Sequence, residues 1–179
     1  RMELLTPLPN YLATHQLTQE NVIKLGIDLC CALELCQRFN IIHRDIKPEN
    51  IFISQFGDYK LGDFGIARTI ERTTYNLSKK GTYSYMAPEV YLEEAYGPSA
   101  DIYSLGIVLY RLLNDNRAPF LPCYPAPITP SDREYALSKQ ISGSPFPLPR
   151  HADRYLASVI MKACAYNAKD RYSNPTEMK

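Results

Sequence analysis

Apolar residues recur at helical spacing through residues 18–38, which is the longest regular pattern in the chain. Thr18 is a suitable N-cap, and Glu20 puts a negative charge in the first turn, where the helix dipole favours it. The pattern predicts a long, mostly buried helix. Its apolar positions form two neighbouring stripes, Val22, Gly26, Leu29, Leu33 and Cys36 in one and Ile23, Ile27 and Cys30 in the other.

Two short apolar runs, residues 51–53 and 59–61, follow this predicted helix. Between them stands Gln55-Phe56-Gly57-Asp58, a composition typical of a hairpin turn, so the runs are predicted to be paired strands. Beyond the hairpin, residues 69–80 are mostly polar and predict an exposed loop.

A second helix is predicted over residues 99–113, with Ser99 as its cap. It is apolar on nearly every side, so we expect it at the centre of the core. Five prolines between Pro119 and Pro130 exclude regular structure there, and further helices are predicted from about Ser131, over residues 151–166 and after Ser173. The chain should therefore be mainly helical.

Composition and charge narrow the class of protein. With 179 residues, 45% of them hydrophobic, the chain can bury one substantial core. Its formal net charge of +1 gives no reason to expect a nucleic acid or an acidic membrane as a partner. No apolar run reaches the roughly 18 residues that a membrane span needs, so we expect a cytoplasmic chain without a membrane segment. The chain opens at Arg1 rather than at Met, which suggests a piece of a longer protein.

The cysteines are odd in number and lack metal-ligand spacing. Because a free cysteine usually behaves as a small buried hydrophobe, we expect all of them to be reduced and packed. They are Cys30, Cys31, Cys36, Cys123 and Cys164.

Three motifs follow the first predicted helix in a fixed order. The first is His43-Arg44-Asp45-Ile46-Lys47-Pro48-Glu49-Asn50, the second is Asp63-Phe64-Gly65 and the third is Ala87-Pro88-Glu89. At about one in twenty for each specified residue, chance does not account for all three together. They resemble the catalytic loop, the metal-binding Asp-Phe-Gly and the end of the activation segment of the protein kinase superfamily, in its eukaryotic Ser/Thr form.

The resemblance covers essentially the whole chain and implies a protein kinase-like α+β fold. Residues 1–179 would be the hinge and the mainly α-helical C-terminal lobe, with short β-hairpins around the catalytic loop, and residues 63–89 would be the activation segment. The Gly-rich loop, the lysine of the third strand and its glutamate partner do not occur in the 179 residues. We therefore expect the parent chain to supply the missing N-terminal lobe.

The residues of the motifs also suit phosphoryl transfer, which asks a protein chiefly for positioning and charge neutralisation. Asp63 and Asn50 supply the hard oxygen donors that Mg²⁺ prefers. Asp45 is left to accept a hydrogen bond from the attacking hydroxyl, and the resemblance makes it the catalytic base. Lys47 resembles the lysine that steadies the transferred phosphate, and its place in Lys-Pro-Glu-Asn is typical of kinases that act on Ser and Thr. Taken one at a time, without the motifs, Asp45, Asn50 and Asp63 would most often be turn-forming residues.

Other site residues are implied only by the resemblance. Thr82 would contact the catalytic aspartate and lysine. The start of the chain resembles the hinge between kinase lobes, although an ordinary apolar strand end is the alternative. The ATP-binding residues would be Met2 as gatekeeper, the backbones of Glu3 and Leu5 at the adenine, and Phe52 beneath it.

Structural roles are implied for four more residues. His43 would be a structural residue beside Phe64 rather than a catalytic one. Asp101 either caps the helix that it opens or, as the resemblance implies, holds the backbone of the catalytic loop. Glu89 and Arg171 would form a buried ion pair, whereas read alone they would be solvated charges.

Two charged residues suggest regulation and substrate choice. Arg44 resembles the arginine that binds a phosphorylated residue of the activation segment in kinases. Ser78 is the first candidate for the phosphorylation site, and Thr73 and Thr74 come next. The alternative is a loop that is not phosphorylated. Glu49 would border the substrate cleft and pair with an arginine of the substrate. The alternative is an exposed glutamate at the rim of the cleft that contacts only water.

The leading hypothesis is a Ser/Thr protein kinase that uses ATP and Mg²⁺. Its partners would be protein substrates with Ser or Thr acceptors and its own N-terminal lobe, and no nucleic acid. The fragment alone should be inactive, because ATP would lose the contacts that hold its phosphates. The alternatives are a pseudokinase, a docking or scaffold module, or a small-molecule kinase, the last disfavoured by the third motif and the helix-rich remainder.

Overall fold

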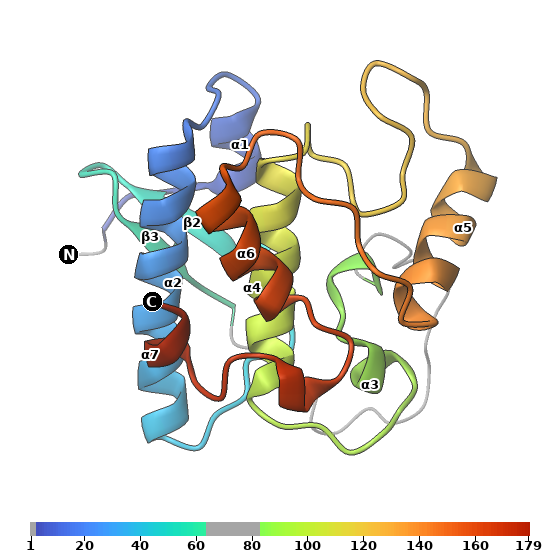
Figure 1. Cartoon of the computed structure of the whole chain (residues 1–179). Coiled ribbons are helices and arrows are strands. Elements are labelled where there is room, and N and C mark those ends of the chain that lie inside the picture. The colour runs from blue at the N-terminus through green and yellow to red at the C-terminus, as the bar shows by residue number, and fades with distance from the viewer. Residues whose placement is uncertain (1–2, 64–82) are drawn as a thin grey trace.

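The computed structural model describes residues 3–63 and 83–179 and is mainly helical, with one small sheet (Figure 1). Elements labelled η are short 3-10 helices. In chain order the elements are β1 (Leu5–Pro7), α1 (Leu8–Leu12), α2 (Gln19–Arg38), η1 (Pro48–Asn50), β2 (Ile51–Ser54), β3 (Tyr59–Leu61), η4 (Tyr83–Tyr85), α3 (Pro88–Tyr91), α4 (Ser99–Leu112), α5 (Pro130–Ile141), α6 (Arg154–Ala163), η5 (Ala168–Asp170) and α7 (Pro175–Met178).

Helix α2 confirms the first predicted helix and its cap. The Thr18 hydroxyl accepts a hydrogen bond from the Asn21 backbone N–H at 3.2 Å, and the Asn21 side-chain oxygen accepts one from the Thr18 N–H at 3.0 Å. These two bonds form a capping box. The expected second buried stripe is wrong in part, because Ile23 and Ile27 are each 38% exposed. The buried face runs through Val22, Leu25, Leu29, Cys30, Leu33 and Cys36.

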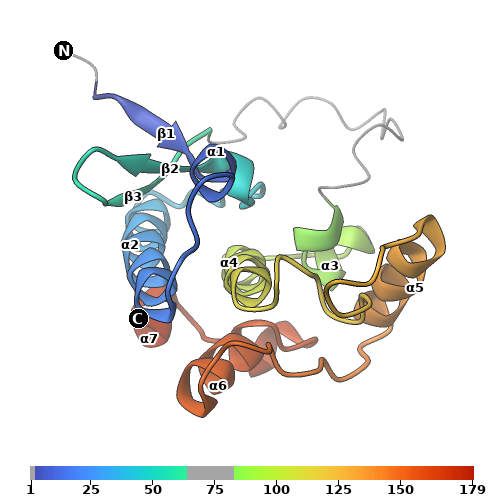
Figure 2. The ribbon, with the colours of Figure 1, turned by 90° about the horizontal axis from the view of Figure 1, so that it is seen from above.

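Helix α4 lies at the centre of the molecule, with α2, α3 and α6 around it (Figure 2). All side chains from Ala100 to Tyr110 are buried, as its apolar surface predicted. The prediction that Ser99 caps this helix is wrong. Ser99 is the first helical residue, and Pro98 precedes it in a helical conformation, with no side-chain cap. The chain enters α4 through a backbone turn instead, in which the Asp101 N–H donates to the Pro98 carbonyl at 3.1 Å.

Helix α6 begins later than the predicted residue 151. Its first residue is Arg154, and Asp153 caps it. The Asp153 carboxylate accepts hydrogen bonds from the N–H groups of Tyr155 and Leu156, both at 2.8 Å. The three residues before Arg154 therefore belong to the connection that precedes the helix.

The predicted hairpin is confirmed, because β2 and β3 pair antiparallel. Strand β1 joins the other side of β2, so the sheet order is β1-β2-β3. Ile51 at the start of β2 lies opposite Leu61 at the end of β3. The chain therefore enters and leaves the hairpin at one end, which brings the residue before Ile51 close to those after Leu61.

All five cysteines are free, but they are not all packed. Cys30, Cys36 and Cys164 are buried as expected, and burial raises the pKa of the Cys30 thiol to about 12. Cys31 and Cys123 are exposed, so the prediction is wrong for these two.

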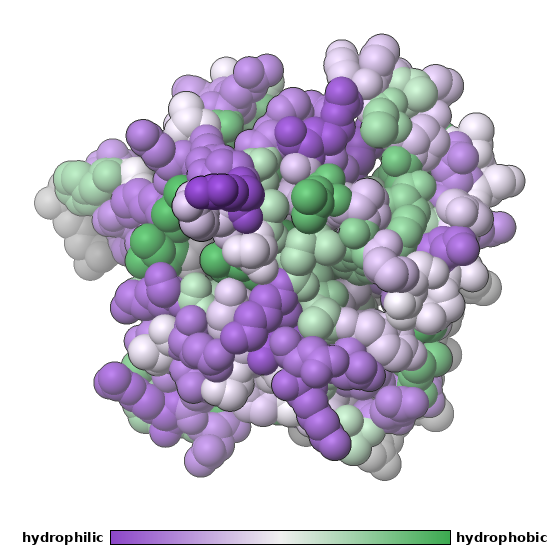
Figure 3. Space-filling model, in the orientation of Figure 1, coloured by the Kyte–Doolittle hydropathy of each residue, from purple (hydrophilic) through white to green (hydrophobic). Residues whose placement is uncertain are grey.

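The surface has no single chemical character on the face that carries α2, α6 and α7. Figure 3 shows polar and apolar side chains interspersed there. Among the described residues, no helix combines the length and the apolar character that a membrane crossing requires.

Candidate active site

The first motif forms a loop in which Asp45, Lys47 and Asn50 are in contact. Lys47 Nζ donates to both carboxylate oxygens of Asp45, at 3.1 Å to Oδ1 and 2.9 Å to Oδ2. Asn50 Nδ2 donates to the Asp45 backbone oxygen at 2.7 Å and to Asp45 Oδ2 at 3.1 Å. Asp45 and Asn50 are only 9% and 5% exposed, so water screens these charge-assisted bonds weakly. The cluster fixes the Asp45 carboxylate in one orientation.

Asp101, in the first turn of α4, holds the backbone of this loop. Its Oδ2 accepts a hydrogen bond from the His43 N–H at 2.7 Å, and its Oδ1 accepts one from the Arg44 N–H at 2.9 Å. Burial raises the pKa of Asp101, and the two backbone bonds oppose that rise. The bonds also hold Arg44 at a φ of 69°, a left-handed conformation that few residues other than glycine adopt. The loop-holding role is confirmed, and Asp101 does not cap its own helix.

The second motif meets the first through the backbone of Gly62. The Gly62 N–H donates to the Asn50 carbonyl at 2.9 Å, and His43 Nε2 lies 3.1 Å from the Gly62 carbonyl oxygen. A side chain at Gly62 would collide with Phe52, because a Cβ there would lie 2.7 Å from its ring. Asp63 comes next, at a φ of 53° and with an exposed side chain. It therefore follows a backbone that is bonded to the catalytic loop at two points.

The donors predicted for Mg²⁺ are the amide oxygen of Asn50 and the carboxylate of Asp63. Because Asn50 Nδ2 donates twice to Asp45, Asn50 Oδ1 is turned to the other side of its amide group. Within residues 3–63 and 83–179, no three His, Cys, Asp or Glu side chains are grouped as a metal cluster. Two hard oxygen donors fit Mg²⁺, since this ion takes one or two protein ligands and completes its shell with water and substrate phosphates.

The residues predicted to bind the nucleotide lie at the sheet. Leu5 begins β1, and Phe52 lies in the adjoining strand β2 with its ring over Gly62. Glu3 precedes β1, and its carboxylate pairs with Lys60 of β3. Met2 lies outside the described residues. The sheet therefore places Leu5 and Phe52 on neighbouring strands. Phe52 lies in β2, the strand that begins directly after Asn50.

Several predicted residues fall in the part of the chain that the structure does not describe. These are Thr82 at the catalytic site, Phe64 beside His43, and the candidate phosphorylation sites Thr73, Thr74 and Ser78. Among the described residues, Arg44 is exposed, and its guanidinium carbon lies 5.6 Å from the centre of the Tyr96 ring.

The ion pair predicted between Glu89 and Arg171 is confirmed. Arg171 Nη1 and Nη2 donate to the two carboxylate oxygens of Glu89, at 2.7 and 2.8 Å. The remaining Arg171 donors reach three backbone carbonyls, and the guanidinium lies 4.7 Å from the centre of the Tyr103 ring. The pair ties the third motif at α3 to the segment before α7.

Two positions that support the site escaped the sequence analysis. Gly62 was not singled out, although a glycine directly before the Asp-Phe-Gly motif is a signal for close backbone approach. Gln140 is buried on α5, and its Nε2 donates to the Ser84 carbonyl at 3.3 Å. A single glutamine on an amphipathic helix gives no sequence signal for such a contact.

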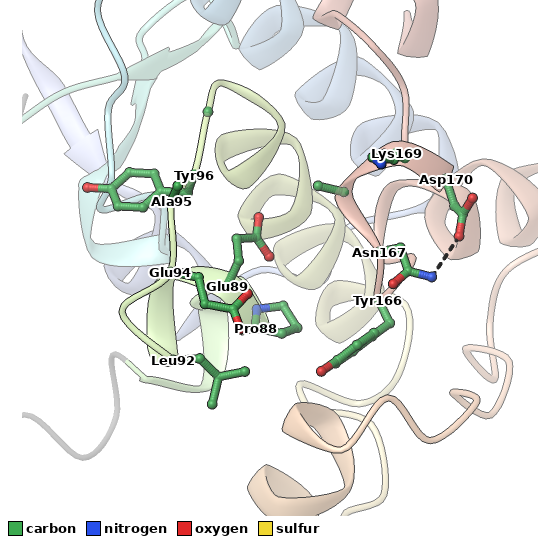
Figure 4. A pocket seen from close by; sticks show the side chains of 12 residues that line it. Pro88, Glu89, Leu92, Glu94, Ala95, Tyr96, Tyr166, Asn167, Lys169 and Asp170 are labelled. Carbon is green, nitrogen blue, oxygen red and sulfur yellow. Dashed lines mark hydrogen bonds between the residues drawn. The ribbon is translucent and has the colours of Figure 1, made fainter.

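A cavity of about 500 Å³ lies away from this cluster, between the end of α3 and the segment around η5 (Figure 4). Its walls include Glu89, Leu92, Tyr96, Tyr166 and Lys169. None of the catalytic-loop residues in contact with Asp45 lines it. The cavity is therefore distinct from the candidate active site.

Residues 2–179 match the family model of the protein kinase domain, and the chain belongs to the protein kinase family. The fold class predicted from the motifs is thereby confirmed.

The chain is similar to several individual protein kinases, two of which are named serine/threonine-protein kinases. The chain is 36% identical over 165 residues to serine/threonine-protein kinase PknB of Mycolicibacterium smegmatis, an alignment that covers 88% of this chain and 25% of that protein. It is 33% identical over 177 residues to PknB of Mycobacterium tuberculosis, covering 91% and 26%. It is 31% identical over 147 residues to the human cAMP-dependent protein kinase catalytic subunit PRKX, covering 82% and 38%. The chain thus spans a minor part of the length of these relatives.

Proposed function

We propose that this chain is the C-terminal lobe of a protein kinase that transfers the γ-phosphate of ATP to serine and threonine hydroxyls of proteins. The observation that carries the proposal is the Asp45 carboxylate, which Lys47 and Asn50 hold within a loop anchored by Asp101. The Ser/Thr specificity is supported by Lys47 in Lys-Pro-Glu-Asn and by the names of the two PknB relatives.

Each member of the cluster has a part in the proposed transfer. Asp45 accepts a hydrogen bond from the substrate hydroxyl, orients it toward the phosphate and takes up its proton. Lys47, which forms an ion pair with the Asp45 carboxylate, places a positive charge where the transferred phosphate would gain negative charge. Asn50 Oδ1 and the Asp63 carboxylate would hold Mg²⁺, which when bound neutralises charge on the phosphate oxygens.

The nucleotide would lie against the sheet. We assign the adenine to the backbones of Glu3 and Leu5, with Met2 as gatekeeper and Phe52 beneath the base. The support is the pairing of β1 with β2, which puts Leu5 and Phe52 on neighbouring strands. Thr82 is assigned, from the family resemblance alone, to contact the catalytic aspartate and lysine.

The ATP phosphates need a second set of contacts that the 179 residues do not contain. No Gly-rich loop or strand lysine of the kinase type occurs in the sequence, and the alignments cover only 25–38% of the three relatives. We therefore assign these contacts to an N-terminal lobe of the parent chain. Residues 1–179 alone should show no kinase-like turnover with peptide and Mg-ATP, and addition of the N-terminal lobe should restore it.

The test of the function is phosphate transfer from ATP to a serine peptide by the full parent protein. Asp45→Asn should lower kcat by roughly 100-fold or more, the usual contribution of a positioned general base. Asp58→Asn is the matched control, because Asp58 lies in the hairpin turn with its side chain 56% exposed. The proposed function would be refuted if the Asp45→Asn variant had the same kcat as the wild type, or if the wild-type parent transferred no phosphate at all. The second result would favour a pseudokinase or docking module.

A further inference from the structure

Phe52 and Gly62 are neighbours on the hairpin that follows the catalytic loop. Phe52 of β2 lies opposite Lys60 of β3, and Gly62 is the second residue after Lys60. Gly62 continues the pairing beyond β3, because its N–H donates to the Asn50 carbonyl at 2.9 Å. Alternate positions along a strand share a face of the sheet, so Phe52 and Gly62 are diagonal cross-strand neighbours on one face. An aromatic side chain reaches across such a diagonal.

The Phe52 ring fills the space that a side chain at position 62 would need. A Cβ atom at Gly62 would lie 2.7 Å from Phe52 Cε2 and 3.1 Å from Phe52 Cδ2. Carbon atoms in contact are normally about 3.5–4.0 Å apart, so the ring and a Cβ cannot both keep these places. The φ of Gly62 lies outside the left-handed region, unlike that of Gly57 in the hairpin turn. Glycine is therefore required at position 62 by the ring and not by the backbone conformation.

The backbone of Gly62 is the fixed partner in this contact. Its N–H is bonded to the Asn50 carbonyl, and its carbonyl oxygen lies 3.1 Å from His43 Nε2. Asn50 and His43 are both buried, so a shift of this backbone would leave buried polar groups without partners. Phe52 is only half-buried, and its ring can turn about the side-chain torsions. A side chain at position 62 would therefore displace the Phe52 ring and leave the backbone that leads to Asp63 in place.

We propose that Gly62 is a positioning residue for the nucleotide, because its lack of a side chain sets where the Phe52 ring lies. The inference rests on the proposed function, which puts Phe52 beneath the adenine, and adds a residue that acts through Phe52. The two residues are matched in size, since a ring at position 52 leaves room only for glycine at position 62. Substitution of Gly62 weakens nucleotide binding through the ring, while Asp63 keeps its place.

The test is a double-mutant cycle in the full parent kinase. Its readouts are the KM for ATP and the calorimetric affinity for a non-hydrolysable ATP analogue with Mg²⁺. Gly62→Ala should weaken both by about fivefold or more, the usual effect of one extra methyl group in a packed site. The kcat at saturating ATP should stay within about twofold of the wild-type value, because the substituted group acts on binding. The loss of affinity should be the same at every Mg²⁺ concentration, since Asp63 is not displaced.

Phe52→Leu supplies the second arm of the cycle. Leucine lacks Cε2, the ring atom nearest to a Cβ at position 62, and so makes room for a side chain there. Phe52→Leu alone should weaken analogue binding by roughly two- to fivefold, because an aromatic contact with the base is lost. Addition of Gly62→Ala to Phe52→Leu should then change the affinity by less than about twofold, so that the two losses are not additive.

Gly97→Ala is the matched control. A Cβ atom at Gly97 would have no atom within 4 Å, and Gly97 is likewise outside the left-handed region. This variant should keep the wild-type KM for ATP and the wild-type analogue affinity. Circular dichroism of each variant establishes that it is folded before its affinity is compared.

Three results would overturn the proposal while leaving the kinase function intact. They are wild-type analogue affinity in Gly62→Ala, an equal loss from Gly62→Ala with and without Phe52→Leu, and a loss that disappears at saturating Mg²⁺. If Gly62→Ala does not fold beside Phe52, Phe52→Leu alone still decides, because unchanged analogue affinity there would mean that the ring is not at the nucleotide. Failure of the wild-type parent to transfer phosphate would instead refute the kinase function, so the two failures are distinguishable.

Discussion

Removing Arg171 should destabilise the protein more than removal of any surface ion pair. Its side chain is fully buried, and that of Glu89 is only 11% exposed. All five guanidinium N–H donors have partners, two on Glu89 and three on the carbonyls of Ser99, Ala165 and Tyr166. Arg171→Met removes all five of these hydrogen bonds and leaves the Glu89 carboxylate without its cationic partner.

The expected loss follows from the burial of the pair. Breaking a buried ion pair by removing one partner costs about 3–5 kcal/mol, because the remaining charge is left uncompensated. For a cooperative unit of 179 residues that corresponds to a fall in Tm of about 6–20 °C. Glu89→Leu should cost a similar amount. The double variant should be no worse than Arg171→Met alone, because loss of the carboxylate removes the unpaired charge.

Urea unfolding of the parent protein, followed by circular dichroism, measures these changes. Far-UV circular dichroism is the suitable signal, since residues 1–179 contain no tryptophan. Lys162→Met is the control, because it breaks the Lys162–Glu177 pair at the same 2.8 Å but with both side chains more than 40% exposed. A loss of stability for Arg171→Met as small as that for Lys162→Met, or additive losses in the double variant, would refute the reasoning.

Three further predictions concern the loop, the cleft and pH. Asp101→Asn replaces the carboxylate oxygen that accepts the His43 N–H with an amide donor, so both Tm and kcat should fall. Thermal melts measure the first and peptide assays the second. Wild-type values of both would contradict the role given to this contact. Glu49→Gln should lower the preference for Arg before the target serine by roughly fivefold or less, and an unchanged Arg-to-Ala peptide ratio would contradict it. The hydrogen bond from Lys162, together with two from Ser173, lowers the pKa of Glu177 from 4.5 to about 2, so the stability that Glu177 contributes is present above pH 4.5 and lost as pH falls toward 2. The Tm difference between wild type and Glu177→Gln should shrink over that range, and a constant difference would argue against the pairing.

The sequence predicted those elements whose signals are local. The capping box of α2 joins Thr18 to a residue three positions later, so both partners can be read together. Ser99 failed as a cap because the backbone turn at Pro98 already starts α4. The exposure of Ile23 and Ile27 could not be read from spacing, because it depends on which side of α2 the central helix packs.

The contacts of the candidate site also differ in how far apart their partners lie in the sequence. The contacts of Asp45 with Lys47 and Asn50 span at most five positions, within one motif. The Glu89–Arg171 pair spans 82 positions and was predicted only through the family resemblance. Arg111 reaches Ser84 across 27 positions and is an arginine at the end of an apolar helix, where charge alone predicts solvation. No local pattern indicates such a contact.

The account depends most on the separate roles of Asp45 and Asp63, and one comparison tests them directly. Mg-dependent affinity for a non-hydrolysable ATP analogue would be measured by calorimetry for the parent protein and for its Asp45→Asn and Asp63→Asn variants. Asp63→Asn should weaken Mg-dependent binding because it removes a metal ligand, whereas Asp45→Asn should leave the affinity near the wild-type value and lower kcat by roughly 100-fold or more. Equal loss of nucleotide affinity in both variants would contradict the assignment of the two carboxylates.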